Sequence, residues 1–97
     1  MNFGQALEEL KLGNKVARSG WNGKSMFIYL VEGSRVNIND LRNEAAKHFD
    51  ADKDINRGRR IKINDHIDMK ASDGSIVVGW SASQIDMLAD DWDVVFK

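Results

Sequence analysis

Residues 66–95 constrain the fold more than any other stretch, because strand and turn signals alternate along them. Residues 66–70 alternate polar and apolar side chains, which predicts a strand with one polar face and one apolar face. Asp73-Gly74 is typical of a two-residue hairpin turn, and residues 75–80 resume an apolar, β-branched run. The first half of this stretch therefore predicts a β-hairpin.

The second half predicts a short helix and a closing strand. Ser83 stands three residues before Asp86 at the start of an apolar run, which is typical of a capped helix with an acidic first turn. This helix should end near Asp90. Residues 92–97 alternate again, so we expect a last strand and a chain that ends inside the sheet.

The first 31 residues predict a helix and two strands. Asn2 is a good N-cap, the apolar residues of 3–10 follow helical spacing, and Gly13 stands where helices commonly end. The apolar runs at 15–18 and 26–31 predict strands. The predicted fold class is α+β: a small antiparallel sheet with an N-terminal helix and one or two further short helices, in a single domain of residues 1–97.

Residues 33–64 are more polar and charged than the rest of the chain, with helical spacing only at 39–49. We expect them to form a variable insertion outside the sheet. Their basic window, residues 57–62, has the charge to contact phosphate, but it contains no aromatic residue. A solvated loop is the favoured interpretation.

Composition narrows the class of partner. Fourteen basic and 15 acidic residues leave a formal net charge of −1, which provides no general attraction for duplex nucleic acid or an anionic membrane. The chain has no Cys and no apolar run near the roughly 20 residues of a membrane span. We expect a cytoplasmic protein, small enough to benefit from self-association.

Catalytic and metal signatures are sparse. No nucleophile elbow, zinc-protease motif or nucleotide-binding glycine motif occurs, so we predict no enzyme and no cofactor. His66 and Asp68 share a strand face and have the donor atoms for a metal, together with Asp65 or Asp86. Paired polar side chains on a solvated sheet face are the favoured interpretation, and we predict no metal site.

The remaining chemistry is that of binding. Trp21 lies between two glycines, beside the amide of Asn22 and the ammonium of Lys24, which suits a stacking surface with polar contacts. Spacing alone nevertheless favours a Trp buried in the core. Trp80 precedes the predicted start of a helix, where free N–H groups favour an anion. Aromatic rings beside phosphate-accepting amides suit a nucleotide.

Three sequence blocks carry a family resemblance: A-R-x-G-W-N-G-K, H-I-D-M-K and G-W-x-A-S-Q-x-D-M-L-A-x-D-W. They lie in the stretches 2–31 and 66–95, about two thirds of the chain, and resemble the Thoeris anti-defence protein two family of small phage proteins. The resemblance implies a sponge that binds a cyclic ADP-ribose isomer, made by a bacterial TIR-domain protein, without cleaving it. It further implies a homotetramer with pockets between protomers, acting in the infected bacterial host, and in some members separate sites for other cyclic oligonucleotides.

The resemblance also implies roles for individual residues. Trp21 would stack on the purine, and Asn22 and Lys24 would contact ribose or phosphate. Asp86 would accept a hydrogen bond from a sugar hydroxyl or the adenine amine. The other residues assigned to the pocket are Arg18, Trp80, Ser83 and Gln84.

Two other classes of function stay open. A protein-interaction module would keep the fold, bind no small molecule and bury Trp21 and Trp80 in its core. An enzyme acting on ADP-ribose derivatives would need a catalytic set, which the sequence does not supply. Exposure of the two indoles distinguishes a pocket from a core, because a pocket Trp is partly accessible.

Overall fold

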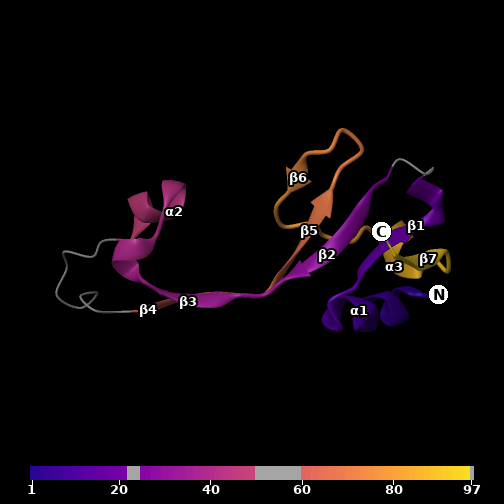
Figure 1. Cartoon of the computed structure of the whole chain (residues 1–97), viewed down its shortest axis with the longest axis horizontal. Helices are drawn as coiled ribbons and strands as arrows, with labels where there is room; N and C mark the ends of the chain where they lie inside the picture. Colours follow the sequence, from indigo (N-terminus) through magenta and orange to yellow (C-terminus); the bar gives the residue numbers. More distant parts are fainter. Residues whose placement is uncertain (22–24, 50–59, 97) are drawn as a thin grey trace. The chain divides into compact units, whose positions relative to one another are not determined.

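The computed structural model describes residues 1–21, 25–49 and 60–96. They form two compact units, one made of Met1–Val31 with His66–Lys97 and the other of Glu32–Asp65 (Figure 1). The second unit nearly coincides with the segment 33–64 that the sequence sets apart. Its role as an insertion stays a prediction.

The first unit is a five-stranded antiparallel sheet with two helices and one turn of 3-10 helix, which confirms the predicted α+β class. The strand order is β6-β5-β2-β1-β7, and every neighbouring pair is antiparallel. Its elements are α1 (Phe3–Lys11), β1 (Lys15–Arg18), η1 (Ser19–Trp21), β2 (Phe27–Val31), β5 (His66–Lys70), β6 (Ile76–Val77), α3 (Gln84–Leu88) and β7 (Trp92–Val95).

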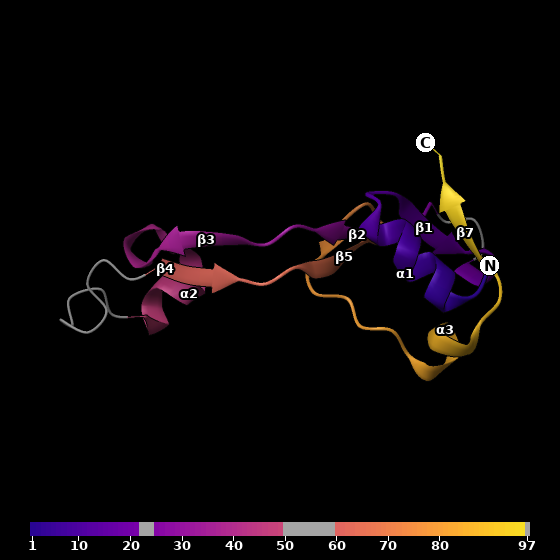
Figure 2. The same ribbon diagram turned by 90° about the horizontal axis from the view of Figure 1, so that it is seen from below.

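The core lies between α1 and one face of this sheet. Val16 pairs with Ile28 across β1 and β2, and Ile28 pairs with Met69 across β2 and β5, so their side chains form a row on one face. Helix α1 lies along β1 and β7 and adds Ala6 and Leu10 to this row (Figure 2). Burial of this apolar face is what holds the helix on the sheet.

Helix α1 begins and ends as its sequence predicts. Asn2 and Gln5 form a capping box, in which each side chain accepts a hydrogen bond from the other residue's backbone N–H. Gly13, with φ of +92°, follows the C-cap in the left-handed conformation that ends many helices.

Replacing Gly4 with Ala is expected to raise the free energy of unfolding by about 0.5 kcal/mol, because Gly in a helix costs conformational entropy. Gly4 lies in the first turn of α1, and an added Cβ would meet only Asn2 Oδ1, at 3.4 Å. Urea unfolding followed by far-UV circular dichroism measures the change. Gly13→Ala is the matched control and should destabilise, since its positive φ strains a residue with a Cβ; equal effects at both positions would contradict the argument.

The hairpin between β5 and β6 is confirmed, but the predicted two-residue turn is wrong. The Ala71 N–H donates to Ser75 O at 2.8 Å and the Gly74 N–H to Ala71 O at 3.0 Å, which leaves three residues in the loop. Gly74 has a φ of +89°, and Asp73 stays at negative φ. A type I turn followed by a left-handed Gly fits this pattern.

The predicted strand at 75–80 is also shorter in the structure. The β5–β6 register would place Gly79 opposite Ile67, but it is Trp80 whose N–H donates to Ile67 O, at 2.7 Å. Gly79 is therefore an extra residue, with φ of +81°, and its N–H donates to the Asp68 carboxylate at 2.9 Å. A bulge of this kind ends regular pairing and redirects the chain.

The last helix and strand are confirmed. Helix α3 has Ser83 as its N-cap and ends at Leu88, close to the predicted end near Asp90. Strand β7 pairs with β1 along its whole length. Phe96 follows it and is 91% exposed, so it adds nothing to the core.

The second unit contains a two-stranded sheet that the sequence analysis did not predict. β3 (Ser34–Asn37) and β4 (Arg60–Ile63) pair antiparallel, and η2 (Ile38–Asp40) and α2 (Asn43–His48) follow β3. The part of the basic window that the structure describes, residues 60–62, lies in β4, so a loop is wrong there. Residues 57–59 lie outside the described residues.

No helix in the described part of the chain is long and apolar enough to cross a membrane.

Candidate functional site

All three tryptophans of the chain meet in the first unit, and we call Trp21, Trp80 and Trp92 the tryptophan cluster. The ring centroids of Trp21 and Trp92 lie 5.3 Å apart, and Trp80 lies 6.3 Å from each of them. The rings cross at 76° to 80°, the edge-to-face geometry that aromatic pairs prefer. Trp92 is buried, whereas Trp21 and Trp80 are partly exposed.

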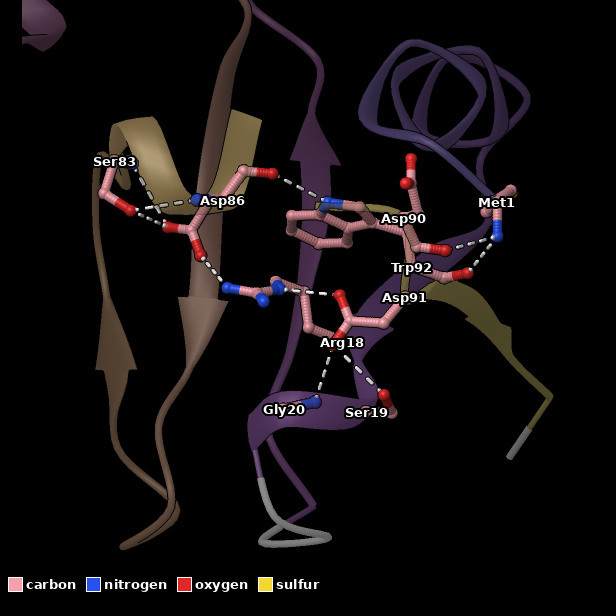
Figure 3. Close-up of polar contacts among 9 residues, drawn as sticks. All are labelled: Met1, Arg18, Ser19, Gly20, Ser83, Asp86, Asp90, Asp91 and Trp92. Atoms are coloured by element: carbon pink, nitrogen blue, oxygen red, sulfur yellow. Dashed lines mark hydrogen bonds and ion pairs between the residues drawn. The ribbon is translucent and has the colours of Figure 1, made fainter. Parts of the chain in front are cut away.

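Trp92 forms the base of this cluster. Its indole Nε1 donates to Asp86 O at 2.9 Å, and its ring packs 5.3 Å from that of Phe3. Its backbone N–H donates to Met1 O, and the Met1 amino group donates to Trp92 O at 2.8 Å (Figure 3). These contacts tie β7 to the start of α1 and to α3.

Arg18 lies beside the cluster, between two carboxylates. Its Nε donates to Asp91 Oδ1 at 2.8 Å, and its Nη1 donates to Asp86 Oδ1 at 2.9 Å (Figure 3). The hydrogen bond to Asp91, followed by that to Asp86, raises the pKa of Arg18. The hydrogen bond from Arg18 is in turn the largest cause that lowers the pKa of Asp91 to about 2. We call Arg18, Asp86 and Asp91 the ion-pair network.

Asp86 also completes the N-terminal cap of α3. Its Oδ2 accepts hydrogen bonds from the N–H and the hydroxyl of Ser83, whose Oγ accepts from the Asp86 N–H. Burial by itself would raise the pKa of Asp86, but the hydrogen bonds from Arg18 and Ser83 outweigh it and lower the pKa. Both carboxylate oxygens of Asp86 therefore already have protein partners.

The structure thus brings together five of the eight residues assigned to a ligand. Asp86 contacts both Arg18 and Ser83, and Trp21 contacts Trp80. Gln84 is exposed in the first turn of α3. Asn22 and Lys24 lie outside the described residues. The ligand roles of all eight stay predictions.

Asp91 is the residue of the site that the sequence analysis does not identify. Its oxygens accept from Arg18, from the Ser19 hydroxyl and from the Gly20 N–H. The available signal was the position of Asp91 immediately before Trp92. Trp92 pairs with Arg18 in the β1–β7 register, which brings an acid next to a base.

The ion-pair network predicts a loss of stability in acid that depends on Asp91. Because the folded-state pKa of Asp91, about 2, is below its ordinary value of 3.8, the unfolded state binds more protons in this range. The contribution of Asp91 is complete above the unfolded pKa and is lost as the pH falls through the folded value. Asp91→Asn should flatten the fall of the unfolding free energy between about pH 5 and pH 2, measured by urea unfolding at each pH.

Asp93→Asn is the matched control for this experiment, since the Asp93 carboxylate accepts only from the adjacent Val94 N–H among the described residues. It should leave the slope unchanged. The unfolding free energy of Asp91→Asn will still fall somewhat in acid, because the Ser75 hydroxyl lowers the pKa of Asp73 and the pKa of Asp86 is lowered too. Equal slopes in the wild type and Asp91→Asn would contradict the prediction.

The pair His66 and Asp68 was predicted to lie on a solvated face, and for Asp68 this is wrong. Asp68 is 7% exposed, and its Oδ1 accepts from the Gly79 N–H and lies 3.6 Å from His66 Nε2. The extra residue at Gly79 brings the chain over this carboxylate and buries it. Within the described residues no group of three or more acids, His or Cys is arranged to hold a metal ion.

A concave surface lies on the sheet face opposite the core. It is largely open to solvent, has a volume of about 460 Å³ and is lined by Phe27, Tyr29, Lys70, Gly74 and Ile76. Two ammonium groups, those of Lys15 and Lys70, lie 4.5 and 5.5 Å from the centre of the Phe27 ring. Lysine stems and cation–π contacts thus already cover part of this aromatic surface.

Comparison with known proteins identifies the family. A family model described as a Thoeris anti-defense 2-like domain matches residues 1–95. The protein named Thoeris anti-defense 2 of Bacillus phage SP01 is 38% identical over 98 residues, and the match covers 98% of this chain and 94% of the phage protein. The matched range, residues 1–95, spans the positions of the tryptophan cluster and the ion-pair network. The chain therefore belongs to the Thoeris anti-defense 2-like family.

Proposed function

We propose that this protein is a phage sponge: it binds a signalling nucleotide of the cyclic ADP-ribose type and withholds it, uncleaved, from the Thoeris effector. Membership of the family supports an anti-Thoeris role and an interaction with the Thoeris signalling pathway. The family is named for anti-defense and not for a reaction. The ligand, its sequestration and action in the cytoplasm of the infected host are parts of the proposal.

The observation that carries the proposal is the partial exposure of Trp21 and Trp80. A Trp that serves only the core is buried like Trp92, at 1% exposure. Two indoles that meet edge to face and keep surface open to solvent are suited to stack on a purine. Trp92 beneath them holds both in place without contacting solvent.

The charges near the cluster limit how a phosphate is bound. Arg18 carries one positive charge and faces two carboxylates, so the ion-pair network has a formal charge of −1. It does not attract a pyrophosphate by itself. We assign the phosphate contact to Lys24, which follows Trp21 by three residues, and give Arg18 the task of orienting the site.

A site shared between protomers supplies what one chain lacks, because residues from two copies converge at a symmetric interface. Apolar side chains exposed on β6 and α3 support self-association: Ile76, Val77, Ile85 and Leu88. We propose a homotetramer with ligand pockets between protomers. Light scattering of the purified protein measures the mass of the assembly and so tests the tetramer.

The proposed function is binding without turnover. Five polar side chains at the site already have protein partners: Arg18, Ser19, Ser83, Asp86 and Asp91 are joined by hydrogen bonds 2.8 to 3.1 Å long. Their oxygens and nitrogens hold the site together. The hydroxyls of Ser19 and Ser83 donate to carboxylates whose pKa is lowered, and such carboxylates are weak bases for activating a nucleophile.

The test is capture followed by release. The purified protein is incubated with the cyclic ADP-ribose isomer made by a TIR-domain protein, the filtrate is assayed for the ligand, and the protein is then heated. We expect depletion in proportion to protein and recovery of intact ligand. Recovery of a cleaved product would identify an enzyme, and no depletion would favour a protein-interaction module. Other cyclic oligonucleotides are offered in parallel to define the ligand class.

A further inference from the structure

The turn that carries Trp21 is too short to hold its own shape. η1 spans only Ser19–Trp21, and an isolated turn of 3-10 helix is not stable in water. Trp21 nevertheless has a defined direction, because its ring lies 5.3 Å from that of Trp92 at 80°. Another part of the protein must fix this turn.

Asp91 makes the contacts that do so. Its Oδ2 accepts from the Gly20 N–H at 2.9 Å and from the Ser19 hydroxyl at 3.0 Å, and its backbone O accepts from the Ser19 N–H at 3.1 Å. Its Oδ1 accepts from Arg18 Nε at 2.8 Å. Four hydrogen bonds thus connect one residue to the three residues directly before Trp21. Figure 3 shows those that the Asp91 carboxylate accepts.

Gly20 adds a second observation. A Cβ at this position would lie 3.1 Å from Asp91 Oδ2 and 3.4 Å from Arg18 Nη2. The carboxylate thus approaches the backbone of the turn so closely that a Cβ at Gly20 would require a shift of a few tenths of an ångström. The absence of a side chain at residue 20 is therefore what lets the carboxylate of residue 91 lie this close to the turn.

We propose that Asp91 is the positioning residue of the ligand site, which aims the Trp21 indole by fixing the turn Ser19–Trp21 to the start of β7. The part of this proposal that concerns ligand affinity rests on the proposed function. Asp91 itself touches no ligand. It acts through Trp21, because each of its contacts ends one or more residues before the indole.

A carboxylate is needed because all of its partners are donors. A carboxamide in its place would have one acceptor oxygen instead of two, and its N–H groups would face either Arg18 Nε or the Ser19 and Gly20 donors. Asp91→Asn therefore keeps the size of the side chain but loses the hydrogen bonds either to Arg18 Nε or to Ser19 and Gly20. Ser19→Ala removes a single bond and no charge, and Gly20→Ala displaces the carboxylate.

The first measurement uses the free protein and needs no ligand. Indoles this close couple their electronic transitions, so the indole bands in circular dichroism report on the geometry of the cluster, which contains every Trp of the chain. Trp21→Phe defines the part of the signal that depends on Trp21. We expect Asp91→Asn and Gly20→Ala to lose that part, and Ser19→Ala to lose less of it, while the far-UV spectrum stays folded.

The second measurement is affinity for the cyclic ADP-ribose isomer. Loss of orientation at a stacking residue is expected to weaken binding by roughly 10- to 100-fold in Asp91→Asn. Asp93→Asn, the matched control two residues away, should stay within about twofold of the wild type. A residue that only stabilised the fold would lower the melting temperature without this selective change in the Trp21 signal.

The two arms separate the two proposals. If the wild type binds no nucleotide, the proposed function fails, and the dichroism of the variants still decides whether Asp91 fixes Trp21. The positioning role is overturned if the Trp21 signal is unchanged in Asp91→Asn. If Asp91→Asn does not fold, an unchanged signal in both Ser19→Ala and Gly20→Ala overturns it instead. A changed signal with unchanged affinity overturns its connection to the ligand.

Discussion

Replacing Trp92 with Ala is expected to lower the free energy of unfolding by about 3–5 kcal/mol, the usual cost of removing a large buried aromatic side chain. Trp92 is 1% exposed and packs against Phe3, Trp21 and Trp80. The change also removes the hydrogen bond from Nε1 to Asp86 O. Domains of this size are stable by only about 5–15 kcal/mol, so a large share of the total is lost. Urea unfolding followed by far-UV circular dichroism measures it.

The matched control is Phe96→Ala, in the residue that follows β7. Phe96 is 91% exposed, so its removal should change the free energy of unfolding by no more than about 0.5 kcal/mol. Trp92→Phe keeps a ring in the core and loses the bond to Asp86, and it should fall between the two. Equal effects of Trp92→Ala and Phe96→Ala would show that the tryptophan cluster does not stabilise the fold.

Replacing Trp21 with Ala is expected to weaken binding of the cyclic ADP-ribose isomer by roughly 10- to 100-fold, since stacking of a base on an aromatic ring contributes about 1–3 kcal/mol. Trp21 is partly exposed, so its loss should cost less stability than the loss of Trp92. Isothermal titration calorimetry gives the affinity, and thermal unfolding shows that the variant is folded.

Trp21→Phe is the control that separates stacking from simple filling of space. A flat ring remains, so most of the affinity should remain, whereas Trp21→Leu keeps apolar volume without a π-face and should bind as weakly as Trp21→Ala. Wild-type affinity in a folded Trp21→Ala would remove Trp21 from the site and leave Trp80 as the only exposed indole of the cluster.

Local signals in the sequence were sufficient for most of the regular elements in the first unit. The capping box at Asn2, the cap at Ser83 and the left-handed glycines at 13 and 74 each act within a few residues of the chain. Such signals do not depend on what the element packs against. This is why α1, α3 and the β5–β6 hairpin agree with prediction.

Long-range contacts decided the details that prediction missed. The extra residue at Gly79 shortens β6, and the Asp68 carboxylate that accepts its N–H is eleven residues away in the sequence. β3 and β4 are separated by more than twenty residues of chain, and the polar-apolar alternation of β4 is only four residues long. Pairing of this kind depends on partners that a local window does not contain.

The sequence by itself determined the binding chemistry: three indoles, an arginine, and serine and aspartate side chains within a few residues of them. Only the tertiary structure decided how those groups are used. The β1–β7 register places Arg18 opposite Trp92, which puts Asp91 against the turn that carries Trp21. The carboxylate of Asp91 therefore binds Arg18 and the turn of its own chain. A carboxylate has the same sequence signature whether it contacts a ligand or holds a neighbouring turn, because the difference lies in which donors the fold brings within about 3 Å.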